Sequence, residues 1–150
     1  MTKFCISIIL LLSSINSFYQ NLFNERIWKI PNRKKAIYLS NGVFHNISKV
    51  KKSKLTQIRN RYVPKLGYER IVLDFSSNKV PRVYGYINTK KSKLFMDIFN
   101  VELSSNIKNL KNTKFLKNVD FYNIDTKTLS IELNQKVKVS YDIFVLENPA

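Results

Sequence analysis

Apolar and polar residues alternate with a period of two along much of the chain after residue 55. In the segment Arg70–Phe75, the residues Ile71, Leu73 and Phe75 fall on one side of an extended chain, whereas Val72 and Asp74 fall on the other. The same alternation recurs in Val83–Ile87, Lys93–Phe99, Leu129–Leu133 and Val137–Val145. These segments are rich in β-branched and aromatic residues, so the pattern predicts antiparallel sheets, each with one covered face.

Two segments depart from this alternation. Ala36–Leu39 and Val43–Phe44 flank a Ser-Asn-Gly sequence, and Asn-Gly favours a tight turn, so we expect a small hairpin there. Leu103, Ile107 and Leu110 have helical spacing within a polar stretch. We expect either a single helical turn or a loop that crosses between sheets.

An internal repeat links the predicted strands. Ile71–Phe75 resembles Leu129–Leu133 at an offset of 58 positions, and each copy begins a unit of strands. The third strand of the first unit is Lys93–Ile98, and its counterpart would begin just after Ala150. We therefore expect a small sandwich of two similar antiparallel sheets whose last strand is missing, as in a fragment of a longer protein.

The N-terminus has the pattern of an export signal. A short basic start is followed by the nine-residue apolar run Phe4–Leu12 and by small polar residues up to Ser17. This run is too short to span a bilayer as a helix, which needs about 20 residues. The pattern predicts a signal helix in residues 1–17 that directs the chain to the periplasm; an uncleaved N-terminal anchor is the alternative.

The charge favours an anionic partner. The chain carries 26 basic and 10 acidic residues, giving a formal net charge of +16, but 20 of the basic residues are Lys. This charge is either functional or a consequence of A/T-rich codons, which also encode Asn and Ile. An exported chain meets peptidoglycan carboxylates and other anionic envelope polymers rather than nucleic acid, so we expect no nucleic-acid partner.

The strand motifs resemble a known family. Arg70–Phe75 is followed about twenty residues later by Lys93–Ile98, then by Ile131–Leu133 and by Tyr141–Pro149. Over residues 55–150 this order is similar to the AMIN domain of periplasmic N-acetylmuramoyl-L-alanine amidases and type IV pilus secretins. Glu132 stands where that family usually has Asp, and the closing strand after Pro149 is missing.

The resemblance implies a compact β-sandwich that binds peptidoglycan and localises the protein that carries it. We divide the chain into a signal peptide (1–17), a basic linker with a possible hairpin (18–54) and an AMIN-like sandwich (55–150). The expected function is a non-catalytic localisation module of the cell envelope. The alternatives are the targeting part of an amidase whose catalytic domain lies elsewhere, and an interaction module of a secretin or pilus assembly.

Candidate ligand-binding residues lie among the arginines and tyrosines. Arg82, Tyr84 and Tyr86 share one side of a predicted strand, and Arg70 is expected on its neighbour, with Arg61 a further donor. Arginine binds carboxylates and phosphates through paired donors, and tyrosine offers an apolar ring to stack on sugars. The alternatives are an ordinary exposed sheet face, or tyrosines that cover a second core.

We expect no catalytic residue, metal or cofactor. The chain has one histidine, His45, and one cysteine, Cys5, which lies inside the predicted signal. A zinc site built from several such ligands is therefore excluded. Asp74 and Asp97 are conceivable as paired carboxylates, but structural ion pairs with Arg70 or Lys93 are the favoured interpretation.

Overall fold

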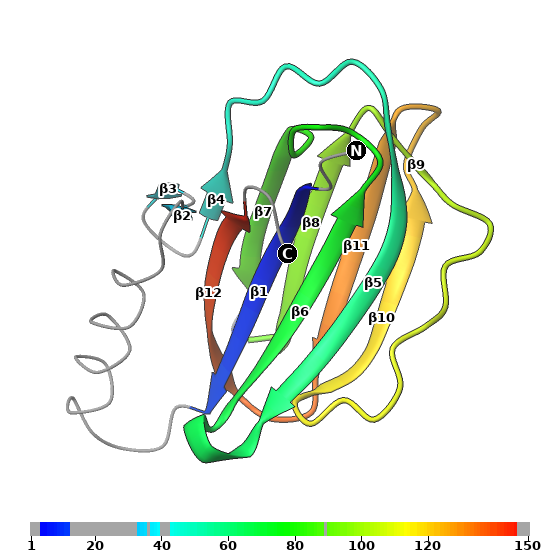
Figure 1. Cartoon of the computed structure of the whole chain (residues 1–150). Coiled ribbons are helices and arrows are strands. Elements are labelled where there is room, and N and C mark those ends of the chain that lie inside the picture. Colours follow the sequence, from blue (N-terminus) through cyan, green and yellow to red (C-terminus); the bar gives the residue numbers. More distant parts are fainter. Residues whose placement is uncertain (1–3, 13–32, 36, 40–42, 89, 147–150) are drawn as a thin grey trace.

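The computed structural model describes residues 4–12, 33–35, 37–39, 43–88 and 90–146, and these residues form a β-sandwich of two six-stranded sheets (Figure 1). Sheet A has the strand order β2-β12-β1-β6-β5-β9, and sheet B has the order β10-β11-β8-β7-β4-β3. All neighbouring strands are antiparallel except β5 and β9. The predicted fold class, a mostly β sandwich of two antiparallel sheets, is confirmed.

The strands of sheet A are β1 (Phe4–Leu12), β2 (Arg33–Lys35), β5 (Ser53–Val63), β6 (Tyr68–Phe75), β9 (Val101–Leu103) and β12 (Val139–Leu146). Those of sheet B are β3 (Ile37–Leu39), β4 (Val43–His45), β7 (Val83–Asn88), β8 (Lys93–Phe99), β10 (Leu116–Asn123) and β11 (Thr128–Gln135). A short 3-10 turn, η1 (Pro64–Leu66), joins β5 to β6, and Gly67 closes it with a φ of 66°.

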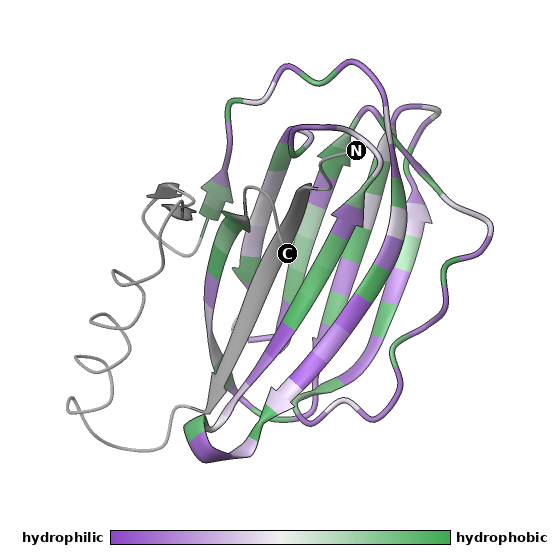
Figure 2. Cartoon of the chain, in the orientation of Figure 1, coloured by the Kyte–Doolittle hydropathy of each residue, from purple (hydrophilic) through white to green (hydrophobic). Residues whose placement is uncertain are grey.

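The core lies between the two sheets and follows the period-two alternation, which Figure 2 shows along the strands. On sheet A, Ile71, Leu73 and Phe75 are buried; on sheet B the same is true of Leu94, Met96 and Ile98, and of Leu129, Ile131 and Leu133. Burial of apolar area stabilises the fold by about 25 cal/mol per Å², so this interior holds the sheets together.

The two sheets have matching strand orders. Read from β2, sheet A runs β2-β12-β1-β6-β5, and read from β4, sheet B runs β4-β7-β8-β11-β10. The repeat counterparts β6 and β11 hold corresponding places in sheets A and B. In the same way, β1 takes the place in sheet A that β8 takes in sheet B. The repeat predicts a third strand at this central place, and in the structure β1 occupies it.

The first described segment, near the N-terminus, is a β-strand. Phe4–Leu12, the apolar run of the predicted signal helix, forms strand β1 in the middle of sheet A. Residues 1–3 and 13–17, the rest of the predicted signal, lie outside the described residues. Export therefore stays a prediction from the sequence.

The segment with helical spacing, residues 103–110, is a crossing loop. It leaves β9 in sheet A and reaches β10 in sheet B, with one turn closed by the Ile107 N–H donating to the Ser104 carbonyl at 3.2 Å. Ile107 and Leu110 pack against the core from this loop. The helical spacing of these residues therefore reflects their packing against the core from a loop, and not a helix.

A buried carboxylate anchors the end of this loop. Glu69 on β6 is fully buried and accepts hydrogen bonds from the Phe115 N–H at 2.9 Å, the Lys114 N–H at 3.1 Å and the Asn60 side-chain amide at 2.9 Å. Backbone donors in such a loop would otherwise be buried without acceptors. Glu69 therefore ties the crossing loop to sheet A.

Glu69→Gln is expected to destabilise the fold by about 2–3 kcal/mol, because the amide turns a donor toward N–H groups that need an acceptor. Urea unfolding of the full chain measures the change in the free energy of unfolding. Glu102→Gln, which alters a partly exposed carboxylate near Lys52 and Lys54, is the control and should change it by less than about 0.5 kcal/mol. Equal effects of the two substitutions contradict the anchoring role.

Gly85 on β7 is expected to tolerate no side chain. A Cβ there would lie 2.2 Å from the Phe44 ring and 2.6 Å from the Phe95 carbonyl oxygen, and the latter is backbone that cannot move aside cheaply. Gly85→Ala should destabilise the chain by about 1–3 kcal/mol in the same unfolding measurement. An unchanged midpoint would show that Phe44 does not lie against Gly85.

Candidate binding face

The alternation of β7 places three of the predicted residues on the outer face of sheet B. Val83 is buried and Gly85 faces the core, whereas Tyr84 is 43% and Tyr86 is 39% exposed. Arg82, immediately before the strand, is also exposed. The structure therefore brings Arg82, Tyr84 and Tyr86 together on one surface.

A row of polar and aromatic residues crosses sheet B at the level of Tyr84. The ladder pairs Tyr84 with His45 on β4 and with Asp97 on β8, and Asp97 with Ser130 on β11. Ser130 in turn pairs with Tyr122 on β10, whose side chain is exposed. Antiparallel neighbours on one face lie about 5 Å apart, so this row crosses five strands, in which Ser130 is buried and Tyr84 and Tyr122 are exposed.

The next row holds an aromatic stack and an ion pair. The Tyr86 ring stacks on Phe95 with centroids 4.8 Å apart and planes 14° from parallel. Lys93 Nζ lies 5.8 Å from the centre of the Phe95 ring and 2.8 Å from a Glu132 carboxylate oxygen. The hydrogen bond to Glu132 raises the pKa of Lys93 above its ordinary value. These contacts fix Tyr86 in place while Tyr84 stays open to a ligand.

A basic hollow borders this face at the Arg82 end. It has a volume of about 480 Å³, and its lining includes Lys49, Lys51, Arg82 and Lys127 with a single acid, Asp125. The Arg82 guanidinium lies 5.2 Å from the centre of the Phe99 ring. Four cations around one hollow favour an anionic group there.

Asp125 does not neutralise the hollow by itself. Its carboxylate accepts hydrogen bonds from the Lys127 N–H at 2.6 Å and the Thr128 hydroxyl at 3.1 Å. The Lys127 backbone hydrogen bond is the main cause that lowers the pKa of Asp125 below its ordinary value. Asp125 thus shapes the 123–128 turn, and cations still outnumber it in the hollow.

The other two predicted residues lie on the opposite sheet. Arg61 on β5 and Arg70 on β6 are direct cross-strand neighbours in sheet A, so Arg70 is not on a strand beside β7 as expected. Arg61 is exposed, and Arg70 has a buried Nε with no hydrogen-bond acceptor among the residues that the structure describes. The five predicted residues therefore form two groups rather than one site.

The predicted carboxylate contacts are replaced by others. Asp74 is held by Arg59, whose Nε and terminal nitrogen donate to its two oxygens at 2.7 and 2.8 Å, and not by Arg70. Lys93 pairs with Glu132 and not with Asp97. Asp74 lies on sheet A and Asp97 on sheet B, so they cannot act together as a carboxylate pair.

Sequence reasoning missed the residues that complete the hollow. Lys49 and Lys51 belong to a charge run that we interpreted as a linker, and Lys127 and Phe99 come from distant segments. Asn100, with a positive φ of 59°, donates from its side chain to the Val50 carbonyl and holds the Lys49–Lys51 segment against the end of β8. Long-range contacts of this kind, which include the Ser53 N–H donating to the Asn100 carbonyl at 2.9 Å, identify the linker as a wall of the hollow.

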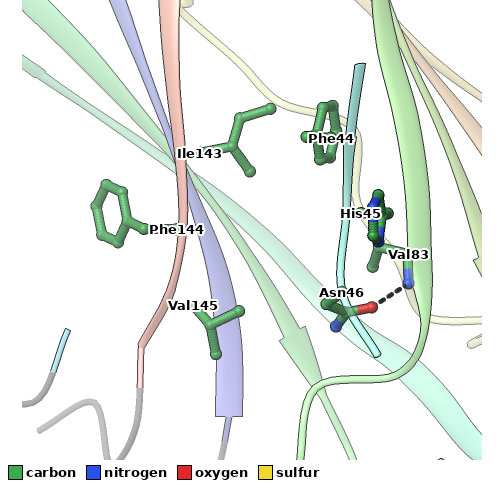
Figure 3. A pocket seen from close by; sticks show the side chains of 7 residues that line it. All are labelled: Phe44, His45, Asn46, Val83, Ile143, Phe144 and Val145. Atoms are coloured by element: carbon green, nitrogen blue, oxygen red, sulfur yellow. Dashed lines mark hydrogen bonds between the residues drawn. The ribbon is translucent and has the colours of Figure 1, made fainter. Parts of the chain in front are cut away.

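His45 lines a separate crevice, shown in Figure 3, where Phe44 of β4 and Ile143 of β12 point toward each other. The crevice holds about 20 Å³, which is room for roughly one water. Asn46 closes its edge by accepting from the Val83 N–H at 2.7 Å. Within the described ranges, no three His, Cys, Asp or Glu side chains gather as a metal site would require.

No family model, no curated protein and no solved structure matches this chain. The assignment of a function therefore depends on the geometry of the face and the hollow.

Proposed function

We propose that this chain is a non-catalytic binding module of a bacterial-type cell envelope, which docks on peptidoglycan through the outer face of sheet B. The observation that carries the proposal is the junction of exposed Tyr84 with the basic hollow around Arg82. Peptidoglycan offers both matching groups, because its sugar rings have apolar faces and its stem peptides carry carboxylates. Another anionic envelope polymer with sugar rings would satisfy the same face.

The two parts of the site have separate roles in this proposal. Tyr84, and beside it the stacked pair of Tyr86 and Phe95, provide a flat aromatic surface for sugar rings. Arg82 adjoins that surface and lines the hollow together with Lys49, Lys51 and Lys127. Its guanidinium can therefore bind a carboxylate through two hydrogen bonds, while the lysines add positive charge. Asp97, which is partly exposed, provides an acceptor for a sugar hydroxyl within the same row.

We further propose that the chain is an AMIN-like module. The support is the order of the strand motifs, from Arg70–Phe75 to Tyr141–Pro149, together with two sheets of matching strand order. Such a module localises another protein or domain. The envelope amidases and the secretin or pilus assemblies are the two settings that this relationship suggests.

The periplasmic location rests on the sequence pattern of residues 1–17, with its basic start, apolar run and small residues up to Ser17. In the part of the chain that the structure describes, there is no helix long and apolar enough to cross a membrane. The proposal assigns no catalytic, metal or cofactor role to any residue.

Tyr84→Ala in the full chain is expected to weaken co-sedimentation with purified sacculi by about three- to tenfold, which corresponds to losing one aromatic contact. Tyr84→Phe keeps the ring and should retain most of the binding. Tyr68→Ala, which removes a partly exposed tyrosine from β6 on the opposite sheet, is the matched control and should leave sacculus binding unchanged. Binding that survives Tyr84→Ala unchanged contradicts the aromatic surface.

Arg82→Gln and Arg61→Gln remove the same charge from opposite sheets. Arg82→Gln is expected to reduce sacculus binding severalfold and to weaken its dependence on salt, because an ionic contact is lost. Arg61→Gln should leave sacculus binding and its salt dependence close to those of the unaltered chain. If Arg61→Gln has the larger effect, the ligand binds sheet A and the proposed face is wrong.

A further inference from the structure

Strand β1 completes sheet A from within. It lies between β6 and β12 and pairs antiparallel with both, over Phe4–Leu11 on one side and Cys5–Leu12 on the other. In Figure 1 it is the dark blue strand in the middle of the front sheet. Both neighbouring strands would therefore have an unpaired edge without it.

The register shows that this place is a regular part of the sandwich. On β6, Ile71 pairs with Ile8 and Leu73 pairs with Ile6. In the matching place of sheet B, the repeat counterparts Leu129 and Ile131 pair with Ile98 and Met96 of β8. The central strand of each sheet thus meets its neighbour in the same register.

The walls of this place are apolar on the core side. Ile71 and Leu73 on β6 are fully buried, and Ile143 on β12, which pairs with Ile8, is 2% exposed. Loss of the central strand would open the core along these residues and leave two rows of backbone N–H and C=O groups without partners. An extended strand with apolar residues at alternate positions is the ligand that would close the core again and pair these backbone groups.

The same nine residues are the apolar run of the predicted export signal. Cleavage after Ser17 would remove β1 from the exported protein. We propose that the place between β6 and β12 is then a strand-accepting groove, filled by an extended, alternately apolar strand of a partner protein in the envelope. This inference rests on the export that the proposed function includes.

A partner strand fits better than a second copy of this chain. A second exported copy has lost its own residues 4–12 and cannot donate them. Each exported copy also carries 25 basic against 10 acidic residues, because cleavage removes Lys3, so two copies repel each other. Strand addition between two free edges supplies affinity through backbone hydrogen bonds, and alternate side chains filling the core supply specificity.

The test uses the full chain with a protease site introduced within residues 13–17. The folded protein is cut in solution, and a labelled peptide with the sequence of Phe4–Leu12 and a terminal Lys tag is added as the probe. We expect the labelled peptide to replace the cut strand saturably, one per chain. We also expect the amides of β6 and β12 to stay protected from hydrogen exchange while it is bound.

The matched control is the same peptide with Pro at the position of Ile8. Proline removes a backbone donor in the middle of the ladder, so this peptide should bind at least about tenfold more weakly. Equal binding of both peptides overturns the proposal, because it shows association without strand pairing. Protected amides of β6 and β12 after the cut strand has left also overturn it, because the groove is then closed without a ligand.

Two further outcomes exclude the partner strand. Light scattering that shows the cut protein as a dimer identifies a second copy as the occupant. An intact mass of the envelope protein that still includes residues 4–12 shows that β1 is retained. Peptide exchange is measured without peptidoglycan, so a failure of the sheet B face to bind sacculi leaves this result unaffected.

Discussion

The packing of two apolar sheet faces is the constraint on which the rest of the structure depends. Once Ile71, Leu73 and Phe75 of β6 face Leu94 and the other buried residues of sheet B, every intervening side chain must point outward. The tyrosines of β7 are exposed because Val83 and Gly85 fill the interior, with Gly85 pressed against the Phe44 ring.

The two outer faces differ in how their charges are satisfied. On sheet A, Arg59 neutralises the buried Asp74, while Arg61 and Arg70 stand opposite each other. On sheet B, Lys93 and Glu132 pair next to an aromatic stack, and the cations gather instead at the end of the sheet. Sheet B thus presents aromatic rings beside a hollow in which four cations face one acid, and this combination is the basis of the proposed glycan binding. Each sheet also depends on a central strand, β1 in sheet A and β8 in sheet B. The packing that orients the candidate binding face therefore depends on whether the place of β1 in sheet A is filled.

The sequence predicted the architecture better than the site. Period-two alternation was sufficient to identify β6, β7, β8, β11 and β12, because each turns alternate apolar residues toward the core. It did not predict that Val72 and Asp74, on the outer side of β6, are also buried. It did not identify β5 or β10, in which a bulge shifts the register at Leu55–Gln57 and at Leu116–Asn118. Arg70 was assigned to the wrong surface because adjacency along the chain does not say which sheet a strand joins. The hollow was missed because Lys49 and Lys127 meet only through long-range contacts.

Peptidoglycan binding by the outer face of sheet B is tested most directly by an NMR titration of the isotope-labelled chain with soluble disaccharide-peptide fragments of peptidoglycan. We expect saturable chemical-shift changes at Arg82, Tyr84 and Asp97 and in the Lys49–Lys51 segment, with the amides of Arg61 and Arg70 unchanged. Shifts confined to β5 and β6, or no shifts at fragment concentrations in the millimolar range, would contradict it.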